Sequence, residues 1–313
     1  MSVTGRFAPS PSGRMHLGNL LCSLLAWLSA KQAGGRVVLR IEDLDAERCP
    51  ARFARQLEED LRWLGLVWDE GGADGGPCGP YCQSQRAELY LRYFEKLRAA
   101  GLVYPCFCSR SQLHAASAPH RADGTPVYGG TCRGLAPAEI AQKSKQRPPA
   151  WRLRVPEDTI AFQDGHLGPY SEYLPRDCGD FVLRRGDGVF AYQLAVVVDD
   201  ALMGVTQVVR GADLLQSTPR QLLLYRLLGL PAPQFYHLPL LLAADGRRLS
   251  KRDGDVSLEQ LQSRYTPRQI VGKLAFLAGL QERPEPASPQ QLAERFCWEK
   301  VPKTDILLPP GLF

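Results

Sequence analysis

The stretch RFAPSPSGRMHLGN, residues 6–19, decides the fold, because it joins a strand candidate to a helix candidate through a stiff, glycine-containing turn. Residues 3–8 read as a short apolar strand, and an apolar helical stretch follows from about residue 16 to residue 33. In α/β folds such a turn is where the phosphates of a nucleotide meet the N-terminus of a helix. Gly13 and Gly18 would let a ligand approach the backbone closely. Neither the P-loop nor the GxGxxG signature occurs, so P-loop and dinucleotide-binding folds lose their main support.

The order of elements predicts a parallel sheet. Residues 37–41 form a second buried-strand pattern and residues 50–64 an amphipathic helix, so strands and helices alternate. From residue 104 to about residue 180, cysteines, prolines and short irregular segments replace this alternation, which indicates an inserted subdomain. Residues 84–101 are a further helical stretch before the insertion. Regular order returns after it, with strand-like runs at residues 189–198, 204–209 and 235–242, and helical stretches at residues 214–228, 258–265, 267–278 and 289–296.

Composition excludes several classes of protein. The 313 residues are 44% hydrophobic and 23% charged, which is ordinary globular usage and argues against disordered and fibrous chains. The net charge of +5 is compatible with a polyanionic partner without establishing one. No signal-peptide pattern is present, and the longest apolar run, residues 20–30, is too short to span a bilayer. Nine scattered cysteines favour free thiols and a metal site over disulfides. We therefore expect a cytoplasmic protein with no membrane contact and no stable protein partner.

Two signatures give the chain a family resemblance. The string from Arg6 to Asn19 resembles the HIGH signature of class I aminoacyl-tRNA synthetases, in the form typical of the glutamyl branch. The string Arg248-Leu-Ser-Lys-Arg252 resembles the KMSKS loop, which is expected some two hundred residues later. Further strings that are similar to this branch are RIEDLD at 40–45, QSQR at 83–86, VVVDDA at 196–201 and VRGAD at 209–213. The resemblance covers about residues 3–255.

The resemblance implies that ATP activates an amino acid by phosphoryl-centre chemistry, in which the protein supplies positioning and charge stabilisation. His16 and Lys251 would be the catalytic residues, with His16 at the helix start and Lys251 neutralising the leaving pyrophosphate. Mg²⁺ would enter with ATP, bound chiefly through the phosphate oxygens. Taken without the upstream signature, residues 247–252 would be an ordinary solvated basic turn. The implied ATP-binding residues are His16, Gly18, Asn19, Arg248 and Lys251.

The resemblance also implies a glutamate pocket, which needs two cations for the carboxylates and one anion for the ammonium group. Arg6 and Arg210 would bind carboxylates, Glu42 would pair with the ammonium group, and Tyr192 would contact the rest of the substrate. Competing interpretations are a surface ion pair for Arg40 or Glu42 and a core position for Tyr192. Arg210 follows an apolar run directly, where an unpartnered charge is costly, which favours a functional role. The implied glutamate-binding residues are Arg6, Phe7, Ala8, Pro9, Ser10, Glu42, Tyr192 and Arg210.

A structural zinc site is the candidate metal centre. Cys106, Cys108 and Cys132 supply three soft ligands within the insertion. Composition alone makes His120 the natural fourth ligand, with His114 nearby. The C-x-C…Y-x3-C pattern of small glutamyl-synthetase relatives implies Tyr128 instead. Unmetallated buried thiols are the remaining alternative, and the metal ligands that we predict are Cys106, Cys108, Tyr128 and Cys132.

The resemblance narrows to one branch of the family. Only 62 residues follow Lys251, which leaves no room for the long anticodon-binding region of ordinary glutamyl-tRNA synthetases. This length and the cysteine pattern resemble the glutamyl-Q tRNA(Asp) synthetases. The implied reaction activates L-glutamate with ATP and transfers it to the queuosine base at the wobble position of tRNA(Asp). Alternatives are a compact synthetase that charges a tRNA 3′ end and a non-catalytic tRNA- or nucleotide-binding paralogue.

The fold that follows is α/β: a Rossmann-type, doubly wound parallel sheet with an inserted zinc-bearing α+β subdomain and a short C-terminal helical segment. We expect residues 1–103 and 181–247 to form the split catalytic domain. Residues 104–180 would be the acceptor-like insertion, and residues 248–313 the KMSKS-like loop and the C-terminal helical region.

Overall fold

The structure, a computed structural model, describes residues 2–45, 47–109, 127–247, 249 and 257–313. Its centre is a parallel sheet that begins with β1 (Thr4–Phe7), β2 (Arg36–Leu39) and β3 (Glu70–Gly71), paired in that order. β9 (Gln207–Gly211) and β10 (Gln234–Leu238) form a second parallel pair. The two groups meet where the backbone N–H of Thr206 donates to the carbonyl of Thr4, 2.9 Å away. The spatial order is therefore β3-β2-β1-β9-β10, in which the chain reverses direction across the sheet beside β1.

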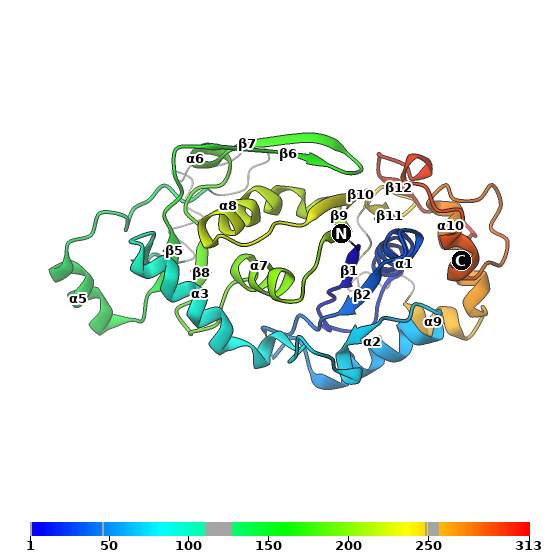
Figure 1. Ribbon diagram of the computed structural model, residues 1–313, viewed down its shortest axis with the longest axis horizontal. Coiled ribbons are helices and arrows are strands. Elements are labelled where there is room, and N and C mark those ends of the chain that lie inside the picture. The colour runs from blue at the N-terminus through cyan, green and yellow to red at the C-terminus, as the bar shows by residue number, and fades with distance from the viewer. Residues whose placement is uncertain (1, 46, 110–126, 248, 250–256) are drawn as a thin grey trace.

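Helices cover both faces of this sheet. Side chains alternate along β2, so that Val37 and Leu39 join one buried cluster and Val38 joins the other. The first cluster includes α1 (Leu17–Gln32), and the second includes α7 (Tyr192–Leu202). Figure 1 shows α7 and α8 on one side of the strands and α1 and α10 on the other. The predicted doubly wound α/β fold is confirmed. The remaining helices of the two faces are α2 (Ala51–Trp63), α3 (Ala87–Ala99), α8 (Thr218–Leu228), α9 (Leu258–Gln262), α10 (Pro267–Leu277) and α11 (Pro289–Ala293).

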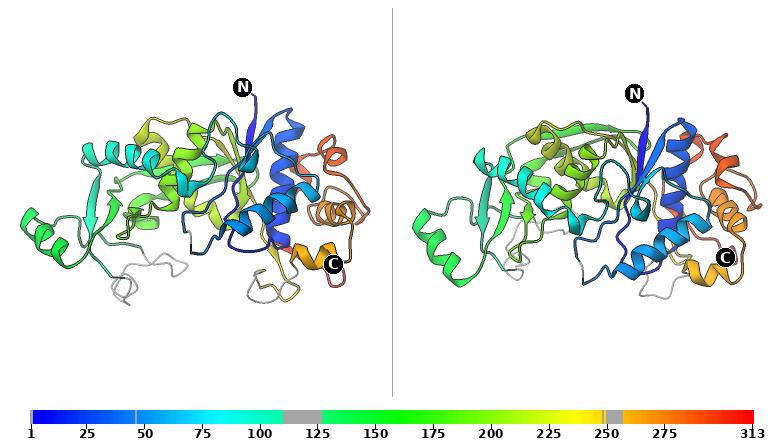
Figure 2. Two further views of the ribbon diagram at one scale, coloured as in Figure 1. Left: turned by 90° about the horizontal axis from the view of Figure 1, so that it is seen from below. Right: turned by 60° about the horizontal axis from the view of Figure 1, so that its bottom comes forward.

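The region between α3 and α7 is built differently, from antiparallel strands. β4 (Val103–Cys106), β5 (Ala150–Leu153) and β8 (Val182–Arg184) form one antiparallel sheet. β6 (Thr159–Asp164) and β7 (Gly168–Tyr173) form a hairpin whose turn reaches β10, since the N–H of Gly165 donates to the carbonyl of Phe235 at 2.8 Å. Among the described residues, the region also contains the helices α5 (Pro137–Gln146) and α6 (Leu174–Asp177). Figure 2 shows α5 at the opposite end of the molecule from the C-terminal helices.

The C-terminal segment is helical, as the sequence predicted, and packs on α1. α10 begins at a capping box in which Thr266 accepts from the N–H of Gln269 and that residue's side chain accepts in return. A short strand pair, β11 (Leu241–Leu242) and β12 (Ile306–Leu307), ties the end of the chain to the sheet region. Among the residues that the structure describes, no helix is long and apolar enough to cross a bilayer.

Two sequence predictions were wrong. Residues 189–198 were expected to be a strand, but Tyr192–Leu202 is helix α7. Residues 194–200 are all buried, and a segment buried on every side has an unbroken apolar run that lacks the helical period. Residues 235–242 were expected to be one strand, but it is divided into β10 and β11 around Pro239, which has no N–H for a ladder bond.

Candidate functional site

A cavity of about 520 Å³ lies where β1, β9 and β10 end and α1 begins. This is the edge at which doubly wound sheets bind their ligands. The cavity brings together every described residue for which a glutamate- or ATP-binding role was predicted, although these residues lie up to two hundred positions apart in the sequence. They are Arg6, Phe7, Ala8, Pro9, Ser10, His16, Gly18, Asn19, Glu42, Tyr192 and Arg210. Arg248 and Lys251 lie outside the described residues, while Leu249 between them lines the cavity.

His16 is fixed as the N-cap of α1. Its Nδ1 accepts from the N–H of Gly18 at 3.1 Å, and its own N–H donates to Oδ1 of Asn19 at 3.3 Å. A neutral imidazole that accepts at Nδ1 carries its proton on Nε2, which is then a donor. A Cβ at position 18 would lie 3.1 Å from Cε1 of His16, so a larger residue there would press on the imidazole. The helix start thus presents a positioned imidazole to the cavity.

Arg210 is a buried cation whose hydrogen-bond partners among the described residues are all neutral. Its side chain is 3% exposed, and burial lowers the pKa of its guanidinium. It donates from Nε to Nε2 of His237 at 3.0 Å, from Nη2 to Oγ1 of Thr218 at 2.7 Å, and from Nη1 to the hydroxyl of Tyr192 at 3.4 Å. All three partners are neutral, and no described carboxylate oxygen lies within 4.0 Å of it. A guanidinium has five N–H groups, so one on each terminal nitrogen is left for an anion in the cavity.

Arg6 lies opposite, at the end of β1, and is also incompletely paired. Its Nη1 donates to the carbonyl of Val209 at 3.0 Å. Its Nε is 3.8 Å from Oδ1 of Asp200 and has no hydrogen-bond partner among the described residues. A buried N–H without a partner is costly unless a ligand accepts from it. The cavity therefore has two arginines with hydrogen-bonding capacity to spare.

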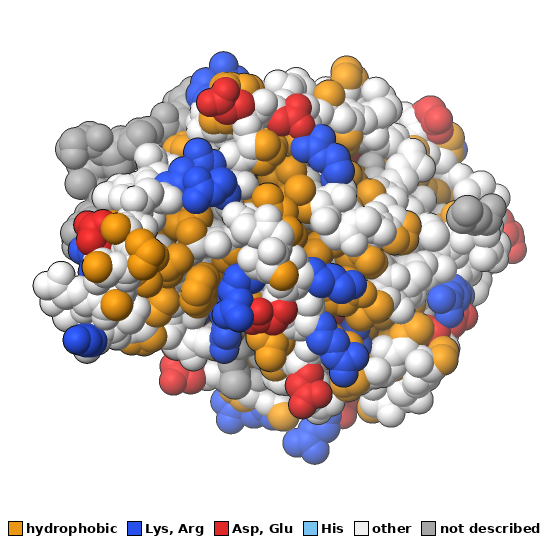
Figure 3. Space-filling model, turned by 60° about the vertical axis from the view of Figure 1, so that its left-hand side comes forward, with side chains coloured by type: hydrophobic (Ala, Val, Ile, Leu, Met, Phe, Trp, Pro, Cys, Tyr) orange, Lys and Arg blue, Asp and Glu red, His pale blue; other side chains and the backbone are white. Residues whose placement is uncertain are grey.

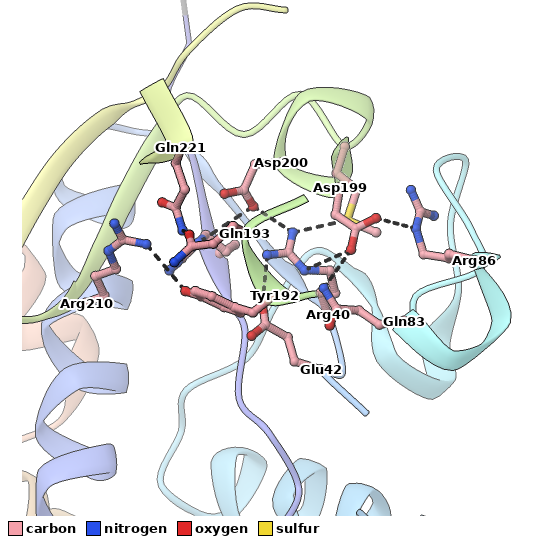
Figure 4. A network of polar contacts seen from close by, with 12 residues as sticks. Arg40, Glu42, Gln83, Arg86, Tyr192, Gln193, Asp199, Asp200, Arg210 and Gln221 are labelled. Carbon is pink, nitrogen blue, oxygen red and sulfur yellow. Dashed lines mark hydrogen bonds and ion pairs between the residues drawn. The ribbon is translucent and has the colours of Figure 1, made fainter. Parts of the chain in front are cut away.

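Glu42 is an acidic side chain at the same cavity and is held by Arg40. Nη2 of Arg40 donates to Oε1 of Glu42 at 3.0 Å, and Nη1 donates to Oδ1 of Asp200 at 2.6 Å. Figure 4 shows Glu42 beneath Arg40 and the hydroxyl of Tyr192 directed toward Arg210. Burial raises the pKa of Glu42 above its usual value, and the charge of Arg40 opposes that rise. Burial likewise raises the pKa of Tyr192 and keeps its hydroxyl protonated.

The alternative of a surface ion pair for Arg40 and Glu42 was wrong, because Arg40 is fully buried. Sequence reasoning also assigned no role to Asp199 and Asp200, which anchor the network behind the cavity. Asp199 accepts from Nε of Arg86 at 2.6 Å, and the Arg40 guanidinium lies between the two aspartates. The only sequence signal was the presence of adjacent acidic residues in an apolar run, where unpaired charges would be costly.

The three predicted cysteine ligands converge in the antiparallel region. The Sγ atoms of Cys106, Cys108 and Cys132 lie within 4.8 Å of one another, with 3.7 Å between those of Cys108 and Cys132. The hydroxyl of Tyr128 lies 3.5 Å from Sγ of Cys106 and 3.8 Å from Sγ of Cys108. Zinc–sulfur bonds at tetrahedral angles place sulfur atoms about 3.8 Å apart, so the cluster is compatible with a zinc site. His114 and His120 lie outside the described residues.

Comparison of the sequence with known proteins identifies the family of this chain. The family described as tRNA synthetases class I (E and Q), catalytic domain, matches residues 2–304. A glutamyl-Q tRNA(Asp) synthetase of Symbiobacterium thermophilum is 54% identical over 312 residues, covering 98% of this chain and 96% of that protein. Another, of Nitratidesulfovibrio vulgaris, is 50% identical over 313 residues, covering 99% of this chain and 97% of that protein.

A solved structure agrees with the sequence comparison. A glutamate tRNA ligase from Elizabethkingia meningosepticum, in complex with its amino acid, superposes with a TM-score of 0.86 at 30% identity. The match covers 100% of this chain and 68% of that one. The family match spans nearly the whole chain, and both relatives align over almost their full length. The chain therefore belongs to the class I tRNA synthetases for glutamate and glutamine, and among them to the glutamyl-Q tRNA(Asp) synthetases.

Proposed function

We propose that the cavity binds L-glutamate beside ATP, joins them as glutamyl-adenylate, and passes the glutamyl group to queuosine at the wobble position of tRNA(Asp). This is the ligase reaction of the family to which the chain belongs. The observation that carries the proposal is Arg210, a buried arginine that lines the cavity and has only neutral partners among the described residues. A carboxylate substrate supplies the missing anion.

Three of the charged side chains that line the cavity, Arg6, Glu42 and Arg210, match the substrate's three charges. Arg210 would bind one carboxylate through its two remaining N–H groups, and Arg6 would bind the other, with the backbone of residues 8–10 close by. Glu42 would pair with the ammonium group, which requires its ionised form. Because burial raises the pKa of Glu42, glutamate affinity should fall on acidification at a higher pH than for an exposed carboxylate.

In the first step, a carboxylate oxygen of glutamate attacks the α-phosphorus of ATP, and the bond to pyrophosphate breaks. His16 at the start of α1 would face the phosphates, where the helix N-terminus favours negative charge. Mg²⁺ accompanies ATP and neutralises part of its phosphate charge. In the second step, a hydroxyl of the queuosine ring attacks the acyl carbon, AMP departs, and the hydroxyl proton is lost.

Lys251 is assigned to the departing pyrophosphate from the KMSKS-like signature. Its ammonium group would stabilise charge that grows only as the bond to pyrophosphate breaks. Lys251→Ala is therefore expected to lower the rate of adenylate formation by at least about 100-fold while changing ATP affinity much less. Single-turnover adenylate formation and ATP binding, measured on the same preparation, test this. Equal losses in both would contradict a role confined to the transition state.

We propose that Cys106, Cys108 and Cys132 hold a structural zinc ion with Tyr128 as the fourth ligand. Tetrahedral coordination with an oxygen ligand places that oxygen about 3.5 Å from each sulfur, close to the Tyr128 distances of 3.5 and 3.8 Å. The backbone N–H of Cys132 also donates to the Tyr128 oxygen at 2.8 Å, which would stabilise a phenolate. When bound, the ion would cross-link the segments that bear Cys106 and Cys132.

The fourth ligand can be tested by metal content. Tyr128→Phe removes the oxygen and is expected to lower zinc retention during dialysis against a chelator by about 10-fold or more, because only three ligands remain. His120→Ala, the matched variant, is expected to retain zinc like the native protein. Metal analysis of the dialysed samples measures both. Retention by Tyr128→Phe with loss from His120→Ala would assign the site to His120 instead.

The tRNA would use the basic surface of the inserted region. Exposed cations lie along and after α5, at Lys143, Lys145 and Arg147. Figure 3 shows Lys and Arg side chains interspersed with hydrophobic, Asp and Glu side chains on the face formed by the left-hand end of Figure 1, where α5 and β8 lie. Phosphate contacts of this kind position a nucleic acid. We propose residues 1–103 and 181–247 as the catalytic domain, 104–180 as the insertion that contacts tRNA, and 248–313 as the signature loop and helical end.

The proposed acceptor is tested with labelled glutamate, ATP and two preparations of tRNA(Asp), one containing queuosine and one lacking it. We expect label to enter only the queuosine-containing tRNA, because the nucleophile belongs to the modified base. Removal of the 3′-terminal nucleotide supplies the control, since it blocks 3′ charging and leaves the queuosine hydroxyls intact. Label transfer that is independent of queuosine, and lost after blocking the 3′ end, would identify a compact synthetase instead.

A further inference from the structure

A chain of three buried side chains runs from the β6–β7 hairpin to the glutamate pocket. Asp164 ends β6, and its Oδ2 is 2.6 Å from Nδ1 of His237 on β10. Nε2 of His237 is 3.0 Å from Nε of Arg210 on β9. Strands β9 and β10 are parallel, with His237 and Arg210 as direct partners in the register, so both side chains leave the sheet on the same face. Asp164 and His237 are 1% and 0% exposed.

The hydrogen bonds fix where the imidazole proton lies. Nε of Arg210 has a proton and no lone pair to offer, so Nε2 of His237 must accept. Thr218, which accepts from Arg210, also lies 3.2 Å from the same Nε2 and can donate its hydroxyl proton to it. The proton of a neutral His237 is therefore on Nδ1 and points to Asp164. Burial lowers the pKa of His237, which keeps the ring neutral, and Arg210 adds to this effect.

The carboxylate of Asp164 is oriented by its backbone contacts. Its Oδ1 accepts from the N–H groups of His166, Leu167 and His237, at 3.0, 2.9 and 3.2 Å. Oδ2 is thereby directed to the imidazole. Asp164 does not line the cavity and is separated from Arg210 by the ring. It is the nearest carboxylate in this chain of contacts, and it reaches the substrate site only through His237.

We propose that Asp164, acting through the tautomer of His237, is a positioning residue that holds the Arg210 guanidinium in the orientation that receives a glutamate carboxylate. This inference rests on the proposed function, since it takes Arg210 as the carboxylate-binding residue. It also gives the inserted hairpin a part in amino-acid recognition. Neither Asp164 nor His237 touches the substrate in this arrangement, and neither moves a proton during the reaction.

Asp164→Asn reverses the direction of the hydrogen bonds from residue 164 to Arg210 and keeps a side chain of the same size at position 164. The amide oxygen stays with the three backbone N–H groups, so the amide NH₂ faces Nδ1 of His237. An NH₂ group can only donate, which forces the imidazole proton to Nε2, where it meets the N–H of Arg210. Two donors then face each other, and the guanidinium turns away from its present orientation. The size and shape of residue 164 are unchanged.

The test is glutamate-dependent exchange between ATP and labelled pyrophosphate. Asp164→Asn is expected to raise KM for glutamate by about 10- to 100-fold, the range typical of residues that orient a ligand-binding side chain, while KM for ATP stays within about twofold. The matched control is Asp158→Asn at the start of the same hairpin. Asp158 pairs with Arg226 at the surface, and its loss should leave both values unchanged.

Two variants at His237 separate positioning from a merely structural role. His237→Gln places an amide oxygen that accepts from Arg210 without needing Asp164, and is expected to raise KM for glutamate less than His237→Ala does. Adding Asp164→Asn to His237→Gln should then raise KM for glutamate only slightly further, because the imidazole whose tautomer Asp164 sets is absent. Additive effects in the double variant would overturn the proposal. His237→Ala also serves if Asp164→Asn does not fold.

Arg210→Ala in the same assay tests the glutamate site separately from the positioning role of Asp164. If its KM for glutamate is native, the proposed glutamate site itself is wrong. If Arg210→Ala loses glutamate use while Asp164→Asn keeps a native KM for glutamate, the proposed glutamate site is supported and the positioning role of Asp164 is overturned. A rise for both variants with unchanged KM for ATP supports the relay.

Discussion

Replacing Arg210 by alanine is expected to lower kcat/KM for glutamate by more than about 100-fold and to leave KM for ATP nearly unchanged. The guanidinium is 3% exposed and its partners are His237, Thr218 and Tyr192, none of which is charged. Removing it leaves a substrate carboxylate in a buried cavity without its cation. Losing one partner of such a pair costs about 2–5 kcal/mol, and each 1.4 kcal/mol is a factor of about ten.

Arg210→Lys refines this expectation. It keeps the charge but cannot bind Thr218, His237 and a carboxylate at once in the planar geometry of a guanidinium. We expect kcat/KM for glutamate in Arg210→Lys to lie between the values of the native enzyme and of Arg210→Ala. Arg226→Ala, which removes an exposed arginine from α8, is the matched control and should behave like the native protein. Steady-state ATP–pyrophosphate exchange at varied glutamate measures all three. Unchanged dependence on glutamate in Arg210→Ala would remove this residue from the pocket.

The sequence was most informative where its signals are local. The turn at residues 6–19 predicts a strand, a helix and their junction together, because proline, glycine and an N-capping side chain act over a few positions. The structure has β1, α1 and the His16 cap there. The same local reasoning failed for α7. Val196, Val197 and Val198 are buried on every side, so the run carries no period to distinguish a helix from a strand.

The partners of the predicted residues were not accessible from the sequence. Asp164 and His237 meet across 73 positions because of where the β6–β7 turn docks, and His237 meets Arg210 because of the register of β9 with β10. No motif encodes either. Arg40 lies in the string RIEDLD, yet its burial between Glu42 and Asp200 follows from the packing of α7 against the sheet. Motifs therefore indicated the residues that face the ligand, and tertiary structure was needed to find the residues that orient them.

Arg40→Met is expected to lower the free energy of unfolding by about 3–5 kcal/mol at neutral pH, the range found when one partner of a buried ion pair is removed. Arg40 is fully buried and lies 2.6 Å from Asp200, 3.0 Å from Glu42 and 3.7 Å from Asp199. Methionine fills similar space and supplies no charge, so the carboxylates remain buried with fewer cations. Arg226→Met, at an exposed pair with 52% and 40% exposed side chains, should change stability by less than about 1 kcal/mol. Urea unfolding of both variants measures the difference.

The pH dependence of the stability lost in Arg40→Met identifies the cause of that loss. Burial already raises the pKa of Glu42 and Arg40 opposes the rise, so Arg40→Met should raise that pKa further. A carboxyl group whose pKa is higher in the folded than in the unfolded state destabilises the fold above that pKa, and the penalty disappears as acid protonates it. The stability gap between Arg40→Met and the native protein should therefore narrow as the pH falls from neutral toward 4. A gap that stays constant over this range would show that Arg40 stabilises the fold by packing alone, and that Glu42 owes its charge state to other neighbours.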